Sequence, residues 1–140
     1  MKTINQNILK VKEGIICHQG NCQGVMGAGV ALQIVRKYPI VLREYQKALK
    51  KGAKLGDIII TPVVDRYLSV ATILGQDRYG KDRKVYTDYD ALEGCLRELG
   101  SLNQQLYFPY KMSCGFAGGD WSKVLGLIEK YCPEGIICKL

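Results

Sequence analysis

The spacing of apolar and polar residues along the chain predicts strands that alternate with amphipathic helices. Residues 14–18 form an apolar run that ends in polar residues and a glycine-rich turn, as expected for a buried strand. Residues 28–38 carry apolar side chains at helical spacing, and Pro39 is placed to end this helix and to open the next one, over residues 40–50. Gly52 ends that second helix.

The rest of the chain continues the alternation. Residues 57–62 and 67–74 are short runs rich in β-branched residues and flanked by turn residues, so we expect two consecutive, buried strands. Strands that alternate with helices form a mostly parallel sheet with helices on both faces, and a ligand then binds in the crevice beyond the strand ends. The remaining predicted elements are a helix that starts after Thr87 or Asp88, a strand at 106–110, a helix at 121–131 and a terminal strand at 136–140.

Length and composition fit one folded domain. A chain of 140 residues can build one hydrophobic core, so we expect a single domain over residues 1–140. The apolar fraction of 47% and the charged fraction of 24% are typical of globular chains. No apolar run reaches the length of about 18 residues that a membrane span needs, and the first residues lack the apolar core of a secretion signal. We therefore expect a cytoplasmic protein that does not act in a membrane.

The net charge of +7 indicates an anionic partner, but it does not by itself indicate nucleic acid. Much of the excess charge lies in four lysines near the predicted end of the second helix and in residues 78–84, a polar loop. Basic residues interleaved with aromatic ones, the pattern that stacks single-stranded nucleic acid, are absent. A small phosphorylated ligand would be attracted by the same field. The four lysines are Lys47, Lys50, Lys51 and Lys54.

The cysteines predict neither a disulfide framework nor a metal site. A domain of this size can bury enough apolar surface without disulfides, so we expect reduced thiols. Only the pair Cys17 and Cys22 approaches the spacing of a zinc knuckle, and the chain has a single histidine to complete such a site. We expect no metal and no cofactor. The six cysteines are Cys17, Cys22, Cys95, Cys114, Cys132 and Cys138.

Two glycine-rich turns follow predicted strands and precede predicted helices. The first covers residues 21–31 and the second covers residues 113–121. Glycines allow close approach of the backbone to a ligand, and the amides at the start of the next helix can bind anionic oxygen. Either turn alone predicts no more than a tight turn, whereas the two together can hold a diphosphate between them. The spacing matches neither the phosphate-binding loop of kinases nor the dinucleotide fingerprint of dehydrogenases.

Both turns resemble the ligand loops of macrodomains. The first resemblance lies in His18-Gln-Gly-Asn-Cys-Gln-Gly-Val-Met-Gly-Ala-Gly-Val-Ala31, and the second in Tyr107-Phe-Pro-Tyr followed by Gly115-Phe-Ala-Gly-Gly-Asp-Trp121. Residues 76–80 and 86–92 strengthen it. The resemblance implies a three-layer α/β/α fold with a mixed, mostly parallel sheet. It also places the chain near the branch associated with ADP-ribose-1″-phosphate phosphatase activity and ADP-ribosyl-ester hydrolysis.

The same resemblance assigns a ligand site. It gives Asn21 and residues 27–29 to the distal ribose, residues 113–118 to the diphosphate and Phe116 to the proximal ribose. Gln6-Asn7-Ile8 stands where macrodomains commonly have Gly-Asp-Ile, so Asn7 would accept from the adenine amino group without the charge of a carboxylate. The carboxylate of Leu140 would lie near the adenosine. The full set of implied ligand-binding residues is Asn7, Ile8, Asn21, Gly27, Ala28, Gly29, Val30, Ser113, Cys114, Gly115, Phe116, Ala117, Gly118 and Leu140.

The candidate catalytic residues are His18, Asn21 and Asp120. Some relatives use a lysine and an aspartate, but these positions fall near residues 74–76 and on Ala117 in this chain, and Lys81 and Lys84 are expected in a solvated loop. His18, the only imidazole, ends a strand three residues before Asn21 and could titrate near neutrality as a proton shuttle, or only shape the site through a hydrogen bond. Asp120 could activate water, although an N-cap of the last helix is favoured.

The sequence leaves three functions open for this site. The leading hypothesis is attack of an ordered water on the 1″ substituent of ADP-ribose-1″-phosphate, with backbone amides holding the charge and no metal. A second is a reader that binds ADP-ribose without turnover. A third is hydrolysis of ADP-ribose from a modified protein or nucleic acid. Cys22 and Cys114 lie inside the turns, but no phosphatase-type Cys-x5-Arg motif accompanies them, so we expect packing roles. We expect a monomer.

Overall fold

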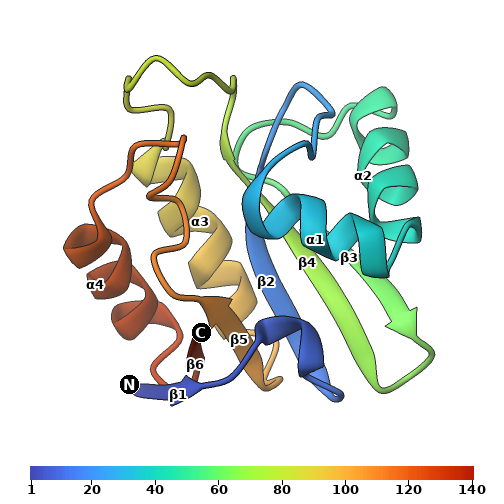
Figure 1. Ribbon diagram of the computed structural model, residues 1–140, viewed down its shortest axis with the longest axis vertical. Coiled ribbons are helices and arrows are strands. Elements are labelled where there is room, and N and C mark those ends of the chain that lie inside the picture. Colours follow the sequence, from blue (N-terminus) through green and yellow to red (C-terminus); the bar gives the residue numbers. More distant parts are fainter.

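A six-stranded sheet with helices on both faces forms the molecule (Figure 1), as a computed structural model covering residues 1–140 shows. The strand order across the sheet is β1-β6-β5-β2-β4-β3. In chain order the elements are β1 (Lys2–Asn5), a 3-10 helix η1 (Ile8–Lys10), β2 (Gly14–Asn21), α1 (Gly29–Lys37), α2 (Ile40–Lys50), β3 (Ile58–Val64), β4 (Leu68–Gln76), α3 (Tyr89–Gly100), β5 (Leu106–Pro109), α4 (Trp121–Tyr131) and β6 (Ile136–Lys139).

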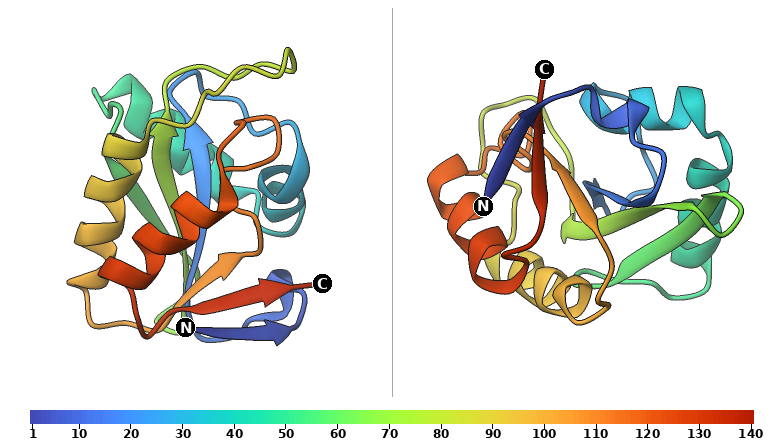
Figure 2. Two further views of the ribbon diagram at one scale, coloured as in Figure 1. Left: turned by 90° about the vertical axis from the view of Figure 1, so that its left-hand side faces the viewer. Right: turned by 90° about the horizontal axis from the view of Figure 1, so that it is seen from below.

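The sheet is mixed and mostly parallel, which confirms the predicted fold class. Four neighbouring strand pairs run parallel, and only β3 runs antiparallel to its single neighbour β4. Successive side chains of a strand point to opposite faces. In β2, Ile15 and Cys17 therefore pack under α3 and α4, while Ile16 packs under α1 and α2. Figure 2 shows these two helical layers on either side of the sheet.

Most predicted elements are confirmed, with differences at the end of one central strand and at the sheet edges. The helices at 40–50 and 121–131 have the predicted bounds. Strand β2 runs three residues beyond the predicted end, because residues 19–21 still pair with β4. The prediction of two buried strands is wrong for β3, which has one neighbour and leaves Ile60 39% and Val64 43% exposed. Strand β1 and helix η1 were not predicted.

Three connections meet at the carboxyl ends of β2, β4 and β5 and form the region of the site. Loop 1, residues 22–28, joins β2 to α1. The roof loop, residues 77–86, leaves β4 and arches over the top of the molecule in Figure 1. Loop 2, residues 110–120, joins β5 to α4. None of the helices combines the length and the apolarity needed to cross a lipid bilayer.

Candidate functional site

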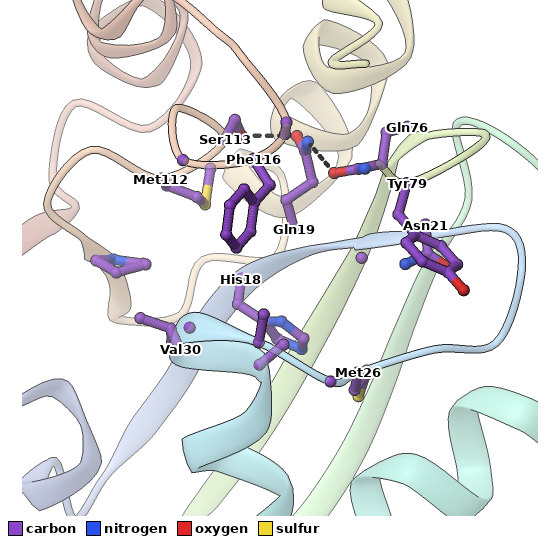
Figure 3. Close-up of a pocket in the computed structure, with 18 of the residues that line it drawn as sticks. His18, Gln19, Asn21, Met26, Val30, Gln76, Tyr79, Met112, Ser113 and Phe116 are labelled. Atoms are coloured by element: carbon purple, nitrogen blue, oxygen red, sulfur yellow. Dashed lines mark hydrogen bonds between the residues drawn. The ribbon is translucent and has the colours of Figure 1, made fainter. Parts of the chain in front are cut away.

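A cleft of about 800 Å³ lies between loop 1, loop 2 and the roof loop, at the end of strand β2. Figure 3 shows side chains from all three loops directed into it. Its position beyond the carboxyl ends of parallel strands is the one that ligands occupy in open α/β sheets. The implied site residues that line it are His18, Asn21, Gly27, Ala28, Gly29, Val30, Ser113, Gly115, Phe116 and Ala117.

Loop 1 is held in shape by the side chain of Asn21. The Asn21 Oδ1 atom accepts from the backbone N–H of Gln23 at 2.9 Å, and Nδ2 donates to the carbonyl of Val25 at 2.9 Å. From helix α2, the Tyr45 hydroxyl contacts Oδ1 of Asn21 at 2.9 Å and its backbone carbonyl, and it accepts from Gly24 N–H at 3.2 Å. Burial raises the pKa of Tyr45 to about 12, so this hydroxyl stays protonated. Tyr45 was not predicted as part of the site.

The start of helix α1 presents free backbone amides to the cleft. Its N-cap residue, Ala28, makes no side-chain hydrogen bond to the helix, so the first N–H groups have no capping partner. Gly29 has a φ of +57°, a backbone conformation that favours glycine and that turns the chain into the helix. Because Ala28, Gly29 and Val30 all line the cleft, this helix end can bind an anionic oxygen.

His18 lies in the floor of the cleft as a buried, neutral imidazole. Its side chain is 2% exposed, its Nε2 is 2.9 Å from the Thr72 hydroxyl, and its Nδ1 has no hydrogen-bond partner. Burial lowers the pKa of His18 from 6.5 to about 4. The expectation that His18 titrates near neutrality is therefore wrong, because the surrounding core disfavours the charged ring. Nδ1 is itself buried, and no protein group satisfies its hydrogen-bonding capacity.

Gln19 joins the segments that meet at the cleft, and it was not predicted as a site residue. Its amide nitrogen donates to Oε1 of Gln76 at 2.9 Å and to the Thr87 hydroxyl at 3.0 Å. Its amide oxygen accepts from the Ser113 hydroxyl at 2.6 Å (Figure 3), and Thr87 in turn donates to the Ser113 carbonyl at 2.9 Å. Gly75 leaves room for this amide, since an added Cβ would lie 2.4 Å from Gln19 Oε1. One feature of the sequence could have pointed to this role: Gln19 is a polar residue that comes soon after the apolar run of strand β2.

Loop 2 owes its shape to its backbone. Ser113 and Gly118 have φ values of +70° and +72°, and the N–H of Gly118 donates to the carbonyl of Gly115 at 3.0 Å. Gly118 packs against the roof loop, where an added Cβ would lie 2.6 Å from the carbonyl oxygen of Lys84. Cys114 turns its thiol to the carbonyl of Met112 and packs against the core under α3 and α4. Gly118 and Cys114 support the loop and are not among the residues that line the cleft.

The roof loop is tied to both glycine-rich loops. Its Asp77 carbonyl accepts from Cys22 N–H at 3.0 Å, and the N–H of Tyr79 donates to Oε1 of Gln23 at 2.9 Å. At its other end, the N–H of Tyr86 donates to the carbonyl of Ala117 at 2.8 Å. Lys81 is exposed, as a solvated loop predicts, but it also lines the cleft with Nζ 5.3 Å from the centre of the Phe116 ring.

Four other implied residues do not line the cleft, and three of them have structural roles. Asn7 caps η1, with Oδ1 accepting from Leu9 N–H at 3.0 Å, which leaves one lone pair of that oxygen for a ligand. Ile8 is buried in the core, and Leu140 is 94% exposed. Asp120 caps α4 by accepting from the N–H and hydroxyl of Ser122, which confirms the favoured capping interpretation. These hydrogen bonds hold the pKa of Asp120 below its usual range.

The charged residues of the site suit an anionic ligand, and its thiols are not suited to act as nucleophiles. The 23 residues that line the cleft include Lys81 and Lys111 but no aspartate or glutamate. All six cysteines are free, and burial raises the pKa of Cys22 and Cys114, which disfavours a thiolate nucleophile in either loop. No group of three or more His, Cys, Asp or Glu side chains is placed to hold a metal ion.

A curated protein shares much of the sequence. The DNA ADP-ribosyl glycohydrolase of Mycobacterium tuberculosis (strain ATCC 25618 / H37Rv) is 41% identical over 122 residues, which cover 84% of this chain and 34% of that protein. The chain thus spans about a third of the length of the first curated relatives that it matches.

Solved structures share the fold across the whole chain. A protein of unknown function from Bacteroides thetaiotaomicron has a TM-score of 0.88 at 25% identity, with 99% of this chain and 97% of that chain covered. The DarTG of Thermosipho africanus, solved in complex with ADP-ribose, has a TM-score of 0.81 at 18% identity, with 99% of this chain and 41% of that chain covered. The model of the Macro domain family matches residues 17–128, and the chain therefore belongs to the Macro domain family.

Proposed function

We propose that this macrodomain binds the ADP-ribose part of a ligand and hydrolyses a group from its 1″ position. The observation that carries the proposal is the cleft itself, in which the uncapped start of α1 and the turns of loop 2 face a space free of carboxylates. Such amides favour the oxygen atoms of a diphosphate. The fold that the chain shares with a protein solved in complex with ADP-ribose supports this ligand.

The first candidate substrate is ADP-ribose-1″-phosphate. A water molecule would attack the phosphorus, the bond from phosphorus to the 1″ oxygen would break, and ADP-ribose and phosphate would leave. Backbone amides of loops 1 and 2 would hold the negative charge that develops. This proposal rests on the anion-binding geometry of the cleft and on the resemblance of its loops to the phosphatase branch.

His18 is the proposed partner of the attacking water. With its proton on Nε2, the ring donates to the Thr72 hydroxyl, and Nδ1 is left as a buried acceptor without a protein partner, on a residue that lines the cleft. A neutral imidazole needs no loss of a proton before it can accept a hydrogen bond from water. Asp120 has no part in this mechanism, because its carboxylate is engaged at the start of α4.

Two assays on the purified chain test the proposal. Calorimetric titration with ADP-ribose should give saturable binding, and ADP-ribose-1″-phosphate should release inorganic phosphate. His18→Gln, which keeps the side-chain volume, should lower the rate at least tenfold and leave ADP-ribose affinity within about twofold. Lys84→Gln, at a roof-loop residue that does not line the cleft, serves as the control. Binding without phosphate release would exclude the phosphatase and leave a reader or an ADP-ribosyl hydrolase, and absence of binding would remove the proposed ligand.

Release of ADP-ribose from modified DNA is the second candidate function. It is favoured by the 41% identity to the mycobacterial DNA ADP-ribosyl glycohydrolase, whose name states that activity. The bond broken would then join the 1″ carbon to the nucleobase, with the same cleft holding the ADP-ribose. An ADP-ribosylated oligonucleotide, assayed beside ADP-ribose-1″-phosphate, separates the candidates: release of unmodified oligonucleotide without phosphatase activity would establish the second and exclude the first.

The proposed setting is a monomer in the cytoplasm. One chain supplies all the residues of the cleft, so the site requires no partner subunit. Six free cysteines suit a reducing compartment. Sedimentation of the purified chain tests the oligomeric state, and a dimer would overturn that part of the proposal.

A further inference from the structure

Lys81 is the one lysine of the roof loop that lines the cleft. The loop that carries it is anchored to loop 1 through Gln23 and to loop 2 through Ala117, so its position over the mouth of the cleft is fixed from both sides. Its ammonium group lies over the ring of Phe116, a residue of loop 2 that is 57% exposed. The lysine thus stands beside the backbone turns that face the proposed diphosphate.

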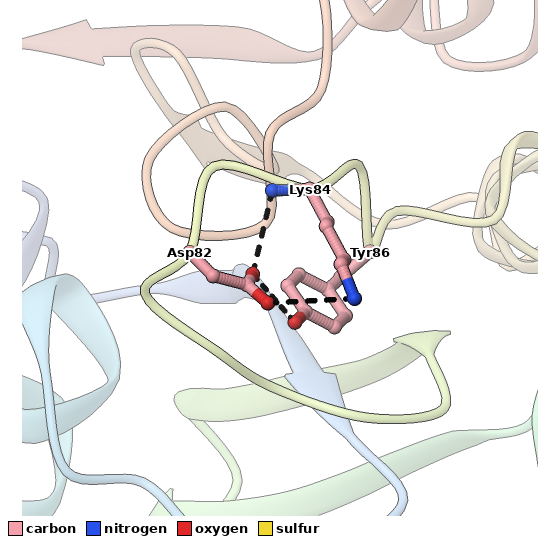
Figure 4. A network of polar contacts seen from close by, with 3 residues as sticks. All are labelled: Asp82, Lys84 and Tyr86. Carbon is pink, nitrogen blue, oxygen red and sulfur yellow. Dashed lines mark hydrogen bonds and ion pairs between the residues drawn. The ribbon is translucent and has the colours of Figure 1, made fainter.

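Lys81 has no counter-ion. The acidic neighbour next in sequence, Asp82, is paired with Lys84 at 3.7 Å and accepts from the Tyr86 hydroxyl at 2.7 Å (Figure 4). The hydrogen bond from Tyr86 holds the pKa of Asp82 below its usual range, so this carboxylate stays charged and engaged. The pair Lys84–Asp82 is the only ion pair in the chain, and the cleft lining contributes no carboxylate. The charge of Lys81 is balanced only by the face of an aromatic ring.

A contact between an ammonium group and an aromatic ring at an exposed site is weak, whereas a contact with a phosphate oxygen gains a charge-assisted hydrogen bond. An arriving phosphate therefore competes favourably for this ammonium group. Lys111, the other cation of the cleft, lies over the ring of Tyr110, 5.6 Å from its centre, and Lys139 lies over the same ring at 4.5 Å. Lys111 and Tyr110 both belong to loop 2, so their contact does not join two loops as the contact of Lys81 with Phe116 does.

We propose that Lys81 is the side chain that recognises the diphosphate of the ligand, leaving the Phe116 ring to bind phosphate oxygen across the mouth of the cleft. This inference rests on the proposed function for the identity of the ligand. It adds a charged side chain to a diphosphate site that the proposed function builds from backbone amides. It therefore makes affinity depend on salt and on the ligand's charge.

The test compares Lys81→Gln with Lys84→Gln, which removes the same charge from the same loop outside the cleft lining. Each variant is titrated with ADP-ribose, with inorganic pyrophosphate and with adenosine at two salt concentrations. Lys81→Gln should weaken ADP-ribose and pyrophosphate about fivefold to tenfold at low salt, flatten the salt dependence and leave adenosine unchanged. Lys81→Arg should restore most of the affinity, and Lys84→Gln should change each affinity by less than twofold.

The two failures are distinguishable. Equal salt dependence and equal affinities in the wild-type chain and Lys81→Gln would overturn the role of Lys81 and leave ADP-ribose binding intact. Wild-type binding of pyrophosphate but not of ADP-ribose, with loss in Lys81→Gln, would support Lys81 and overturn the proposed function. Failure of the wild-type chain to bind either diphosphate would overturn both.

Discussion

The two glycine-rich loops that enclose the cleft each join a strand to a helix, but they are held in different ways. Loop 1 is held by side chains: Asn21 bonds its backbone, and Tyr45 reaches up from α2 to support it. Loop 2 is held by backbone conformation, with left-handed residues at Ser113 and Gly118 and close packing against Lys84. Glycine content alone therefore does not say what fixes a ligand loop. Each loop should lose its conformation under a different substitution.

Gly118→Ala should have the largest effect on stability, because it disturbs the backbone conformation that holds loop 2 in shape. An added Cβ would meet the Lys84 carbonyl at 2.6 Å on a residue with a φ of +72°. We expect a loss of about 3 kcal/mol in the free energy of unfolding, measured by urea denaturation. Gly115→Ala, where an added Cβ has no neighbour within 4 Å, is the control and should cost less than about 0.5 kcal/mol. Equal losses would show that loop 2 is not held in this way.

The burial of His18 beside loop 1 should make stability depend on pH. The pKa in the fold is about 4, below the ordinary 6.5, so the folded state favours the neutral ring. The contribution of the neutral His18 ring to the free energy of unfolding is fully present above pH 6.5. It falls as the pH drops towards 4, by about 3 kcal/mol in total. The difference between the wild-type chain and His18→Gln across pH 4–7 isolates it from the carboxylates. A constant difference over this range would contradict the burial of an uncharged ring.

Tyr45→Phe tests the side-chain support of loop 1. It removes the hydroxyl that contacts two oxygen atoms of Asn21 and the N–H of Gly24. We expect a loss of about 2 kcal/mol in stability, since buried polar groups lose a partner, together with weaker ADP-ribose binding. Tyr67→Phe, at a tyrosine that is 57% exposed, is the matched control. If both variants bind and unfold alike, the hydroxyl does not hold loop 1.

Ser113→Ala should have the smallest effect of the four. It deletes one hydrogen bond to Gln19 and leaves the backbone of loop 2 in place. We expect a loss of about 1 kcal/mol in thermal unfolding experiments and little change in the conformation of loop 2. A loss as large as that of Gly118→Ala would mean that side chains hold loop 2 as well, and the contrast between the loops would disappear.

Local sequence patterns predicted the helices and strands whose apolar residues face a core. They did not predict elements whose formation or position depends on pairing with segments far away in the chain. Helices 40–50 and 121–131 follow from the apolar spacing of their own residues. Strand β1 has four residues with only Ile4 partly buried, and it pairs with β6 at the other end of the chain. The local sequence does not predict that pairing, and it does not predict that β3 lies at an edge of the sheet.

The candidate site was predicted unevenly for the same reason. The glycine-rich turns identified most of the cleft, because glycine content is visible in the sequence. The support of Asn21 by Tyr45 and the position of Lys81 over Phe116 arise from contacts between segments far apart in the chain. The low pKa of His18 comes from burial, which only the packed sheet and helices create.

The amide of Gln19 gives the cleft its preorganisation. One side chain of β2 is bonded to the end of β4, to the segment before α3 and to loop 2, so the walls keep their relative positions before any ligand arrives. Ligand binding then needs to order few further residues, and less of the contact energy is lost to conformational entropy. A change that loosened this one amide would weaken every ligand of the cleft together, whatever its chemistry.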